Sequence, residues 1–234
     1  MVDARLQHPF TLLISGPTGC GKTEWISRFL ERCDSLMTHT PHRLIFCFSE
    51  WQPLYQRLGE RMKKKNINTV FVKGAENLDT VIDEYDIEHP QILVFDDLMG
   101  ESEAFILPWF TKKSHHRNVS VIHVMQNLFN QCKEQRNISL NAHYMVIFRN
   151  IRDMAQIAYL GRQIFPQKQK MLTQCYEDAT SVHYRPLFLD LKAPNNVLRL
   201  RTNILEENGH PFTEVYTFPL NRECQERKRE KVII

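Results

Sequence analysis

The residues Phe10 to Thr23, with the sequence FTLLISGPTGCGKT, decide the fold of this chain. The apolar run 10–14 predicts a buried strand, and the next segment, Gly16–Thr23, matches G-x-x-x-x-G-K-[ST] at every fixed position. Glycines in such a loop let backbone N–H groups turn toward phosphate oxygens, because no Cβ restricts their φ angles. We expect a helix over Lys22–Arg32, whose N-terminus favours a bound anion.

All eight residues of the loop are candidate ligands of a nucleotide: Gly16, Pro17, Thr18, Gly19, Cys20, Gly21, Lys22 and Thr23. Lys22 offers a positive charge to the β- and γ-phosphates, and the Thr23 hydroxyl is a ligand for Mg²⁺. A chance glycine-rich turn is the alternative interpretation, and the order strand, loop, helix argues against it. The pattern therefore predicts a bound nucleoside triphosphate with Mg²⁺.

Length, charge and cysteine content limit the kinds of protein that this sequence can encode. The 234 residues suffice for one domain with a full core, and a net charge of only +3 leaves any nucleic-acid contact to local basic patches. The six cysteines are scattered without zinc-ligand spacing, which indicates reduced thiols in an intracellular compartment. The N-terminus lacks the apolar stretch of a signal peptide, and no apolar run approaches membrane-spanning length, so we expect no membrane partner.

A second strand brings carboxylates toward the phosphate loop. Residues 91–97, QILVFDD, hold four consecutive apolar residues, as in a strand buried on both faces of a parallel sheet. Asp96 and Asp97 stand at its carboxyl end, where ligands bind in open α/β sheets. We assign Asp96 to the Mg²⁺ shell, which is the Walker B role, and Asp97 to polarising the attacking water.

A third buried strand, Val119–Met125, ends in Gln126. We interpret Gln126 as a sensor of the γ-phosphate, with a simple strand-end cap as the alternative. This position is typical of NTPases that insert an extra strand between the phosphate-loop strand and the Walker B strand. The expected fold is a three-layer α/β P-loop NTPase of this type, with a mainly parallel central sheet. We expect residues 1–205 to form the ATPase domain and residues 206–234 a C-terminal extension with a charged tail.

The reaction can be narrowed from the residues alone. The guanine-reading N-K-x-D motif of GTPases is absent from the sequence, and a nucleotide kinase needs no paired acids after its Walker B strand. The Asp96–Asp97 pair together with Gln126 favours activation of water, and hence ATP hydrolysis. We expect ATP and Mg²⁺ as the cofactors.

Four blocks of sequence resemble the FtsK–HerA superfamily of DNA-pumping ATPases. The likeness is greatest to its A32-like branch, the genome-packaging ATPases of poxviruses, other large DNA viruses, virophages and Polinton (Maverick) elements. The blocks are GPTGCGKT, ILVFDDLM, HHRNVSVIHVMQNLF and NAHYMVIFRNIRDMAQIAYLGRQIFP. The likeness extends over residues 10–205, and the last two blocks are far more specific than the phosphate loop.

The resemblance implies a homo-oligomeric ring of five or six subunits that threads double-stranded DNA into a preformed capsid. It also implies a capsid or portal-type vertex protein as partner, and a location in the infected host cell, in nucleus or cytoplasm, or in the virion. Asp97 would be the catalytic acid and Gln126 the sensor, with an arginine supplied by the neighbouring subunit. Arg117 is the first candidate for this arginine and Arg149 the second, and an ordinary surface arginine is the alternative for each.

The sequence departs from this superfamily at one catalytic position, and two other functions are alternatives to DNA pumping. Many relatives place Glu where Asp97 stands, which leaves the identity of the catalytic base open. The basic loops expected at Lys63–Lys65 and Lys112–Arg117 are candidates for contacts to the DNA backbone, or are solvated faces. The alternative functions are a nucleotide-regulated interaction module and a helicase-like ATPase in DNA replication.

Overall fold

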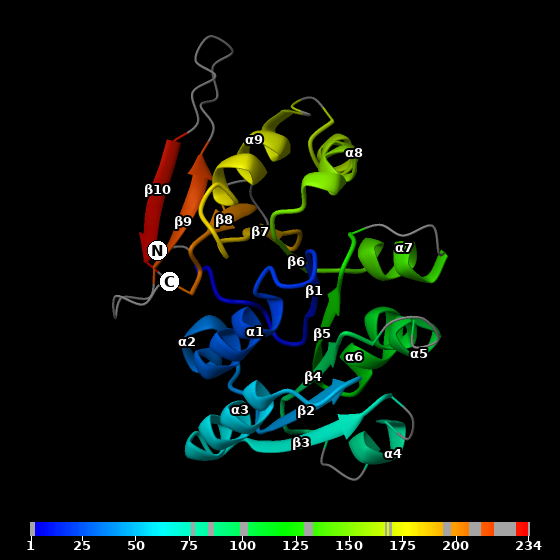
Figure 1. Cartoon of the computed structure of the whole chain (residues 1–234). Helices are drawn as coiled ribbons and strands as arrows, with labels where there is room; N and C mark the ends of the chain where they lie inside the picture. Colours follow the sequence, from blue (N-terminus) through cyan, green and yellow to red (C-terminus); the bar gives the residue numbers. More distant parts are fainter. Residues whose placement is uncertain are drawn as a thin grey trace.

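The computed structural model describes residues 3–75, 78–83, 87–98, 103–128, 133–166, 168, 170–193, 198–205, 212–217 and 228–233. The strands within these residues are β1 (Thr11–Ser15), β2 (Arg43–Phe48), β3 (Asn68–Lys73), β4 (Gln91–Asp96), β5 (Val119–Met125), β6 (Tyr144–Ile147), β7 (Leu187–Asp190), β8 (Leu200–Thr202), β9 (Phe212–Thr217) and β10 (Lys228–Ile233). They form one ten-stranded sheet in the order β10-β9-β8-β7-β6-β1-β5-β4-β2-β3 (Figure 1).

The helices connect these strands. They are α1 (Lys22–Glu31), α2 (Cys33–Leu36), α3 (Pro53–Lys64), α4 (Leu78–Asp83), α5 (Glu103–Pro108), the π-helix η1 (Trp109–Lys113), α6 (Ser114–His116), α7 (Lys133–Leu140), the 3-10 helix η2 (Ile151–Asp153), α8 (Met154–Ile164) and α9 (Lys170–Ala179). None of the helices in the described part of the chain is both long enough and apolar enough to cross a membrane.

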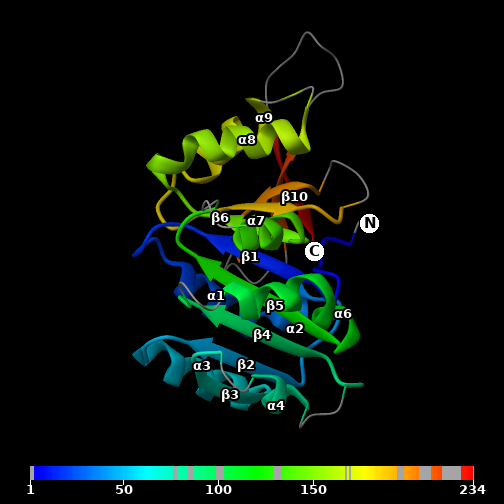
Figure 2. The same ribbon diagram turned by 90° about the vertical axis from the view of Figure 1, so that its right-hand side faces the viewer.

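The sheet has a parallel half and an antiparallel half. The six strands from β3 to β6 pair in parallel, and Figure 2 shows them one above another with β3 at the bottom. The strands from β6 through β7, β8 and β9 to β10 pair antiparallel. Strand β5 lies between β1 and β4, which confirms the predicted inserted strand.

Two hydrophobic cores cover the two faces of the sheet and make the three expected layers. Side chains of β1 alternate between them: Leu13 packs with residues of α4, α5, α7, α8 and α9, whereas Leu12 and Ile14 pack with residues of α1, α2 and α3. This alternation follows from the two-residue period of a strand. The observed architecture is therefore the predicted three-layer P-loop NTPase fold.

Both basic runs expected in loops lie largely on helices instead. Lys63 and Lys64 end α3, whose residues Tyr55, Leu58 and Met62 recur at helical spacing and are buried. Burial of this apolar face stabilises the helix as far as Met62, so the neighbouring basic residues are helical too. In the second run, residues 112–116 belong to η1 and α6. Pro108 is the last residue of α5, but the chain continues directly into the π-helix η1 and then into α6.

The antiparallel strands are fixed by a buried ion pair. Arg201 on β8 donates from Nη2 to Asp190 Oδ2 on β7 over 3.0 Å, and its guanidinium lies 4.4 Å from the ring centre of Phe188. The Thr202 hydroxyl donates to the Pro186 carbonyl over 3.1 Å. Residues 212–217 and 228–233, within the expected C-terminal extension, continue the same sheet as β9 and β10.

Candidate nucleotide-binding and hydrolysis site

The phosphate loop follows β1 and turns tightly beside the end of β6. Gly19 and Gly21 have positive φ angles of 80° and 95°, which glycine adopts without strain. At Gly16 the reason is space, because a Cβ there would lie 2.6 Å from Phe148 Cβ and 2.7 Å from Cys20 Sγ. The positive φ angles at Gly19 and Gly21 are those that the motif predicts, whereas the close packing at Gly16 is a further reason for glycine that the structure adds.

Lys22 opens α1 and turns back over the loop. Its Nζ donates to the carbonyl oxygens of Gly16, at 2.6 Å, and of Pro17, at 2.9 Å. The ammonium is thus held at the mouth of the loop, where the first N–H groups of α1 also point. A bound triphosphate would meet a lysine charge and helix N–H donors from the same side.

Asp96 ends β4 and is buried, with only 2% of its surface exposed. Its Oδ2 accepts a hydrogen bond from the Tyr55 hydroxyl over 2.9 Å. Burial raises the pKa of Asp96, while hydrogen bonds from Tyr55 and Thr23 act in the opposite direction and favour the carboxylate. The structure therefore brings Asp96 and Thr23 together, as the predicted metal site requires.

A magnesium ion suits these two side chains. A hydroxyl and a carboxylate are hard oxygen ligands, and Mg²⁺ takes only one or two protein ligands, with water and substrate phosphates completing its shell. The described residues contain no group of three or more His, Cys, Asp and Glu side chains able to hold a metal ion by themselves. Thr23 and Asp96 would hold the ion, which would polarise the phosphate oxygens.

Asp97 and Gln126 contact each other beside the phosphate loop, where the Gly16 N–H donates to the Met125 carbonyl. Gln126 Nε2 donates to Asp97 Oδ1 over 3.4 Å, so the ends of β5 and β4 are joined by their predicted catalytic side chains. Asp97 is exposed, and its φ of 53° places it in the left-handed region that few non-glycine residues adopt. The chain turns at Asp97, so the Asp97 side chain is exposed to water although the preceding Asp96 is buried.

The two candidate arginines lie at opposite edges of the sheet. Arg149 follows Phe148, whose N–H donates to the Ser15 carbonyl, and is exposed beside its own phosphate loop. Arg117 precedes β5 and is half-buried at the amino-terminal edge. A seven-residue strand spans about 23 Å, so Arg117 lies far from the nucleotide site of its own subunit. Arg117 is therefore too far away to act in the nucleotide site of the same chain, whereas Arg149 is exposed near that site.

Tyr55 is the site residue that sequence reasoning did not identify. It lies 41 positions before Asp96 in a segment without a catalytic motif, and its buried ring packs against Phe46 and Phe48. In the sequence it is one apolar position of an amphipathic helix. The one feature of the sequence that could have pointed to Tyr55 is its place in a helix that follows a parallel strand, because such a helix packs on the face of the sheet.

The strand order, the inserted strand and the glycine-rich loop after β1 define a P-loop NTPase fold. No family model and no curated protein matches the sequence. Among solved structures, the chain is similar to the genome packaging NTPase B204 from Sulfolobus turreted icosahedral virus 2 in complex with ATP-γS. The TM-score is 0.46 and the identity 10%, covering 83% of this chain and 96% of that chain.

The cytoplasmic domain of EssC is a second similar structure, with a TM-score of 0.46 and 10% identity. That likeness covers 64% of this chain and 33% of the EssC chain, so this chain spans about a third of the length of that protein.

Proposed function

We propose that this chain is an ATP-driven double-stranded DNA translocase that packages a viral or virus-like genome into a preformed capsid. The observation that carries the enzymatic part is the contact between Asp97 and Gln126 beside a complete phosphate loop. A protein that only binds a nucleotide has no need for an exposed carboxylate and an amide in contact beside its phosphate loop. The four sequence blocks that resemble packaging ATPases support the DNA-pumping part.

Each side chain has a defined task in the proposed hydrolysis. Lys22 exchanges its loop carbonyls for the β- and γ-phosphate oxygens, and backbone N–H groups of the loop hold the rest of the triphosphate. Asp97 accepts a hydrogen bond from the attacking water and takes its proton as the water oxygen bonds to the γ-phosphorus. The bond from that phosphorus to the β–γ bridging oxygen breaks, and ADP and phosphate are the products. Gln126 donates to the γ-phosphate or the water and is released when phosphate leaves.

DNA contacts are proposed at the amino-terminal edge of the sheet, away from the nucleotide. Lys63 and Lys64 at the end of α3, and Lys112 in η1, are exposed there. By contrast, Lys65 pairs with Asp34 over 3.0 Å and Lys113 with Asp79 over 2.6 Å. Contacts from flexible lysines to phosphates carry no sequence information, which suits a motor that must move along any sequence.

The proposed working form is a homo-oligomeric ring. An arginine from one subunit, Arg117 or Arg149, would complete the site of the next, so loss of the γ-phosphate would loosen the subunit interface. The ring would work with a capsid or portal-type vertex protein in the infected host cell. The two alternative functions are a helicase-like ATPase and a nucleotide-regulated interaction module.

The experiment compares ATP turnover with linear duplex DNA, with single-stranded DNA and without DNA, on protein whose assembly is followed by electron microscopy. The proposal expects rings with ATP and duplex, and turnover that rises with duplex. Turnover that rises only with single strands would favour the helicase. Negligible turnover under every condition, with rings present, would favour the interaction module.

A further inference from the structure

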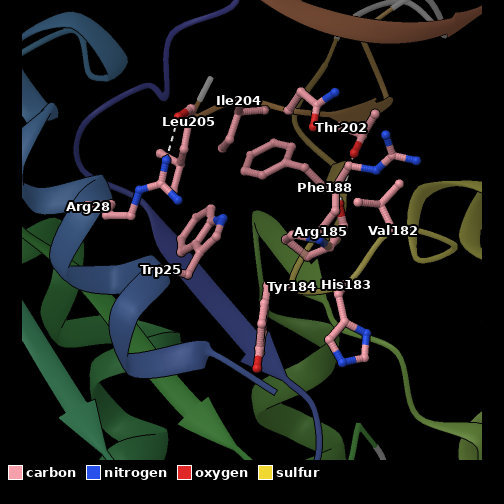
Figure 3. A pocket seen from close by; sticks show the side chains of 12 residues that line it. Trp25, Arg28, Val182, His183, Tyr184, Arg185, Phe188, Thr202, Ile204 and Leu205 are labelled. Atoms are coloured by element: carbon pink, nitrogen blue, oxygen red, sulfur yellow. Dashed lines mark hydrogen bonds between the residues drawn. The ribbon is translucent and has the colours of Figure 1, made fainter. Parts of the chain in front are cut away.

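A cavity of about 520 Å³ lies against α1, the helix that follows the phosphate loop. Trp25 and Arg28 line it from α1, and His183 and Tyr184 line it from the segment before β7 (Figure 3). Leu205, in the segment after β8, lines the side nearest Arg28, whose Nη2 donates to the Leu205 carbonyl oxygen over 3.3 Å (Figure 3). The volume lies in the range typical of small-molecule pockets. None of the residues to which we assign a role in hydrolysis lines this cavity.

The cavity is joined to the phosphate loop through Tyr184. A Cβ placed on Gly21 would lie 3.1 Å from Tyr184 Cδ1, so the ring rests over the residue that caps α1. Tyr184 has a φ of 60° and is 65% exposed, and its ring lies 5.0 Å from that of His183. Non-glycine residues in the left-handed region carry backbone strain, and they cluster at active sites and ligand clamps.

Topology explains why this segment reaches the nucleotide. Strand β7 runs antiparallel to β6, with Leu187 opposite Ile147. The residues before β7 therefore lie at the carboxyl edge of β6, which is also the edge where β1 delivers the phosphate loop. Tyr184 therefore lies between the phosphate loop, which it approaches at Gly21, and the cavity that it lines, so a nucleotide with its phosphates in the loop has this ring beside it.

We propose that this cavity holds the nucleobase and ribose of the bound nucleotide, with the base against the Tyr184 ring. The proposal rests on the proposed function and extends the same site. Aromatic rings offer stacking surface, and the charges in the lining come from Arg28 and Arg185. The lining residues include no Asp or Glu, so the pocket has no carboxylate to accept hydrogen bonds from the N1 and N2 groups of guanine. Contacts to the face of a base favour purines over pyrimidines through stacking area.

The test compares two ligands that share the triphosphate but differ in the nucleoside: ATPγS and inorganic tripolyphosphate. Binding of both is measured by calorimetry to the full chain and to Tyr184→Ala. The variant should weaken ATPγS by roughly 5- to 100-fold, the range expected for a base stacked on an aromatic ring, and leave tripolyphosphate unchanged. Tyr159→Ala is the matched control, because Tyr159 is also an exposed tyrosine, on α8, and it should change neither affinity.

Other outcomes separate this proposal from the function on which it rests. Unchanged ATPγS affinity in Tyr184→Ala would overturn the pocket assignment, and so would an equal loss for both ligands, which would mean that Tyr184 supports only the loop. Lys22→Ala should weaken both ligands. A wild-type chain that bound neither ligand would overturn the proposed function and this proposal together.

A second readout uses the unmodified chain. Trp25 lines the cavity, so ATPγS should change the tryptophan emission, whereas saturating tripolyphosphate should not. The change should disappear in Trp25→Phe and persist in Trp51→Phe, a control on the far side of α3's aromatic cluster. A change that is equal for both ligands would contradict the placement of the base.

Discussion

The hydroxyl of Tyr55 donates to Asp96 Oδ2 over 2.9 Å, and this contact ties the α3 layer to the carboxylate predicted to hold magnesium. Tyr55 is 1% exposed and packs against Phe46 and Phe48, so its hydroxyl cannot move away from Asp96 without disturbing the core. Partners of a metal ligand orient it and tune its affinity for the ion. Tyr55 is therefore a positioning residue of the site.

Removing only the hydroxyl tests this role. Tyr55→Phe should fold normally, because the ring contacts remain, and should lower metal affinity or turnover by about 10- to 100-fold. The loss should appear as a higher Mg²⁺ concentration at half-maximal turnover, measured by steady-state phosphate release. Tyr159→Phe, which removes a hydroxyl from the surface, is the control. An unchanged Mg²⁺ dependence in Tyr55→Phe would remove Tyr55 from the site.

Asp97→Asn separates binding from chemistry. The amide keeps the size of the side chain but cannot take a proton from water, so ATP binding should persist while hydrolysis falls by about 10²- to 10⁴-fold. Asp96→Asn, in contrast, should weaken Mg²⁺-dependent binding. Calorimetry with ATPγS and single-turnover hydrolysis measure the two effects. Full turnover in Asp97→Asn would place the base elsewhere, and lost binding would give Asp97 a share of the metal.

The positions of Arg117 and Arg149 lead to a mixing experiment. An arginine supplied from a neighbour contributes roughly 10³ to 10⁵ in rate, so Arg117→Ala and Lys22→Ala should each be nearly inactive alone. In mixed rings some Arg117→Ala subunits, which keep an intact loop, receive the guanidinium of a Lys22→Ala neighbour, and turnover should partly return. The same mixture with Arg149→Ala distinguishes the candidates. Mixed rings that form but stay inactive in both cases would exclude both arginines as trans donors.

His123 makes stability depend on pH. It is buried on β5 between the rings of Phe95 and Phe110, and burial lowers its pKa to about 4 from 6.5. Between these values the unfolded chain binds a proton that the native chain does not, so stability is highest above pH 6.5 and falls as the pH drops toward 4. The loss from this residue is about 3 kcal/mol.

Chemical denaturation at pH 7 and pH 4.5 measures this loss. His123→Leu should lose less stability between the two pH values than the wild type, while His116→Gln, at an exposed position, should lose as much as the wild type. Equal slopes in wild type and His123→Leu would show that His123 is already protonated in the native chain, or that it titrates alike in both states.

The parts of the site that could be predicted from sequence are those written in local patterns. A strand, a glycine-rich loop and a helix in succession predict the path of residues 10–31, and apolar runs ending in polar residues predict where Asp96, Asp97 and Gln126 stand. These side chains meet because parallel strands share one carboxyl edge. Local patterns predicted that Asp97 and Gln126 follow the ends of buried strands, whereas the hydrogen bond between the two side chains is a finding of the structure.

Other parts arise from packing between distant segments. Nothing near Tyr55 in the sequence points to Asp96, and nothing near Tyr184 points to Gly21, because each pair meets only after the sheet has formed. The basic run at the end of α3 was expected in a loop, since its charges masked the helical spacing that Met62 completes. Such contacts depend on the register of strands and the length of helices, which propensity fixes only loosely.

Displacement of a triplex-forming oligonucleotide from linear duplex DNA shows whether this protein translocates on DNA, because only a protein that moves along the duplex removes the third strand. With ATP and Mg²⁺, assembled wild-type protein should release the labelled strand, and the delay before release should grow with the distance to be travelled. Lys22→Ala should release none. Wild-type rings that hydrolyse ATP but leave the triplex intact at every distance would contradict the account.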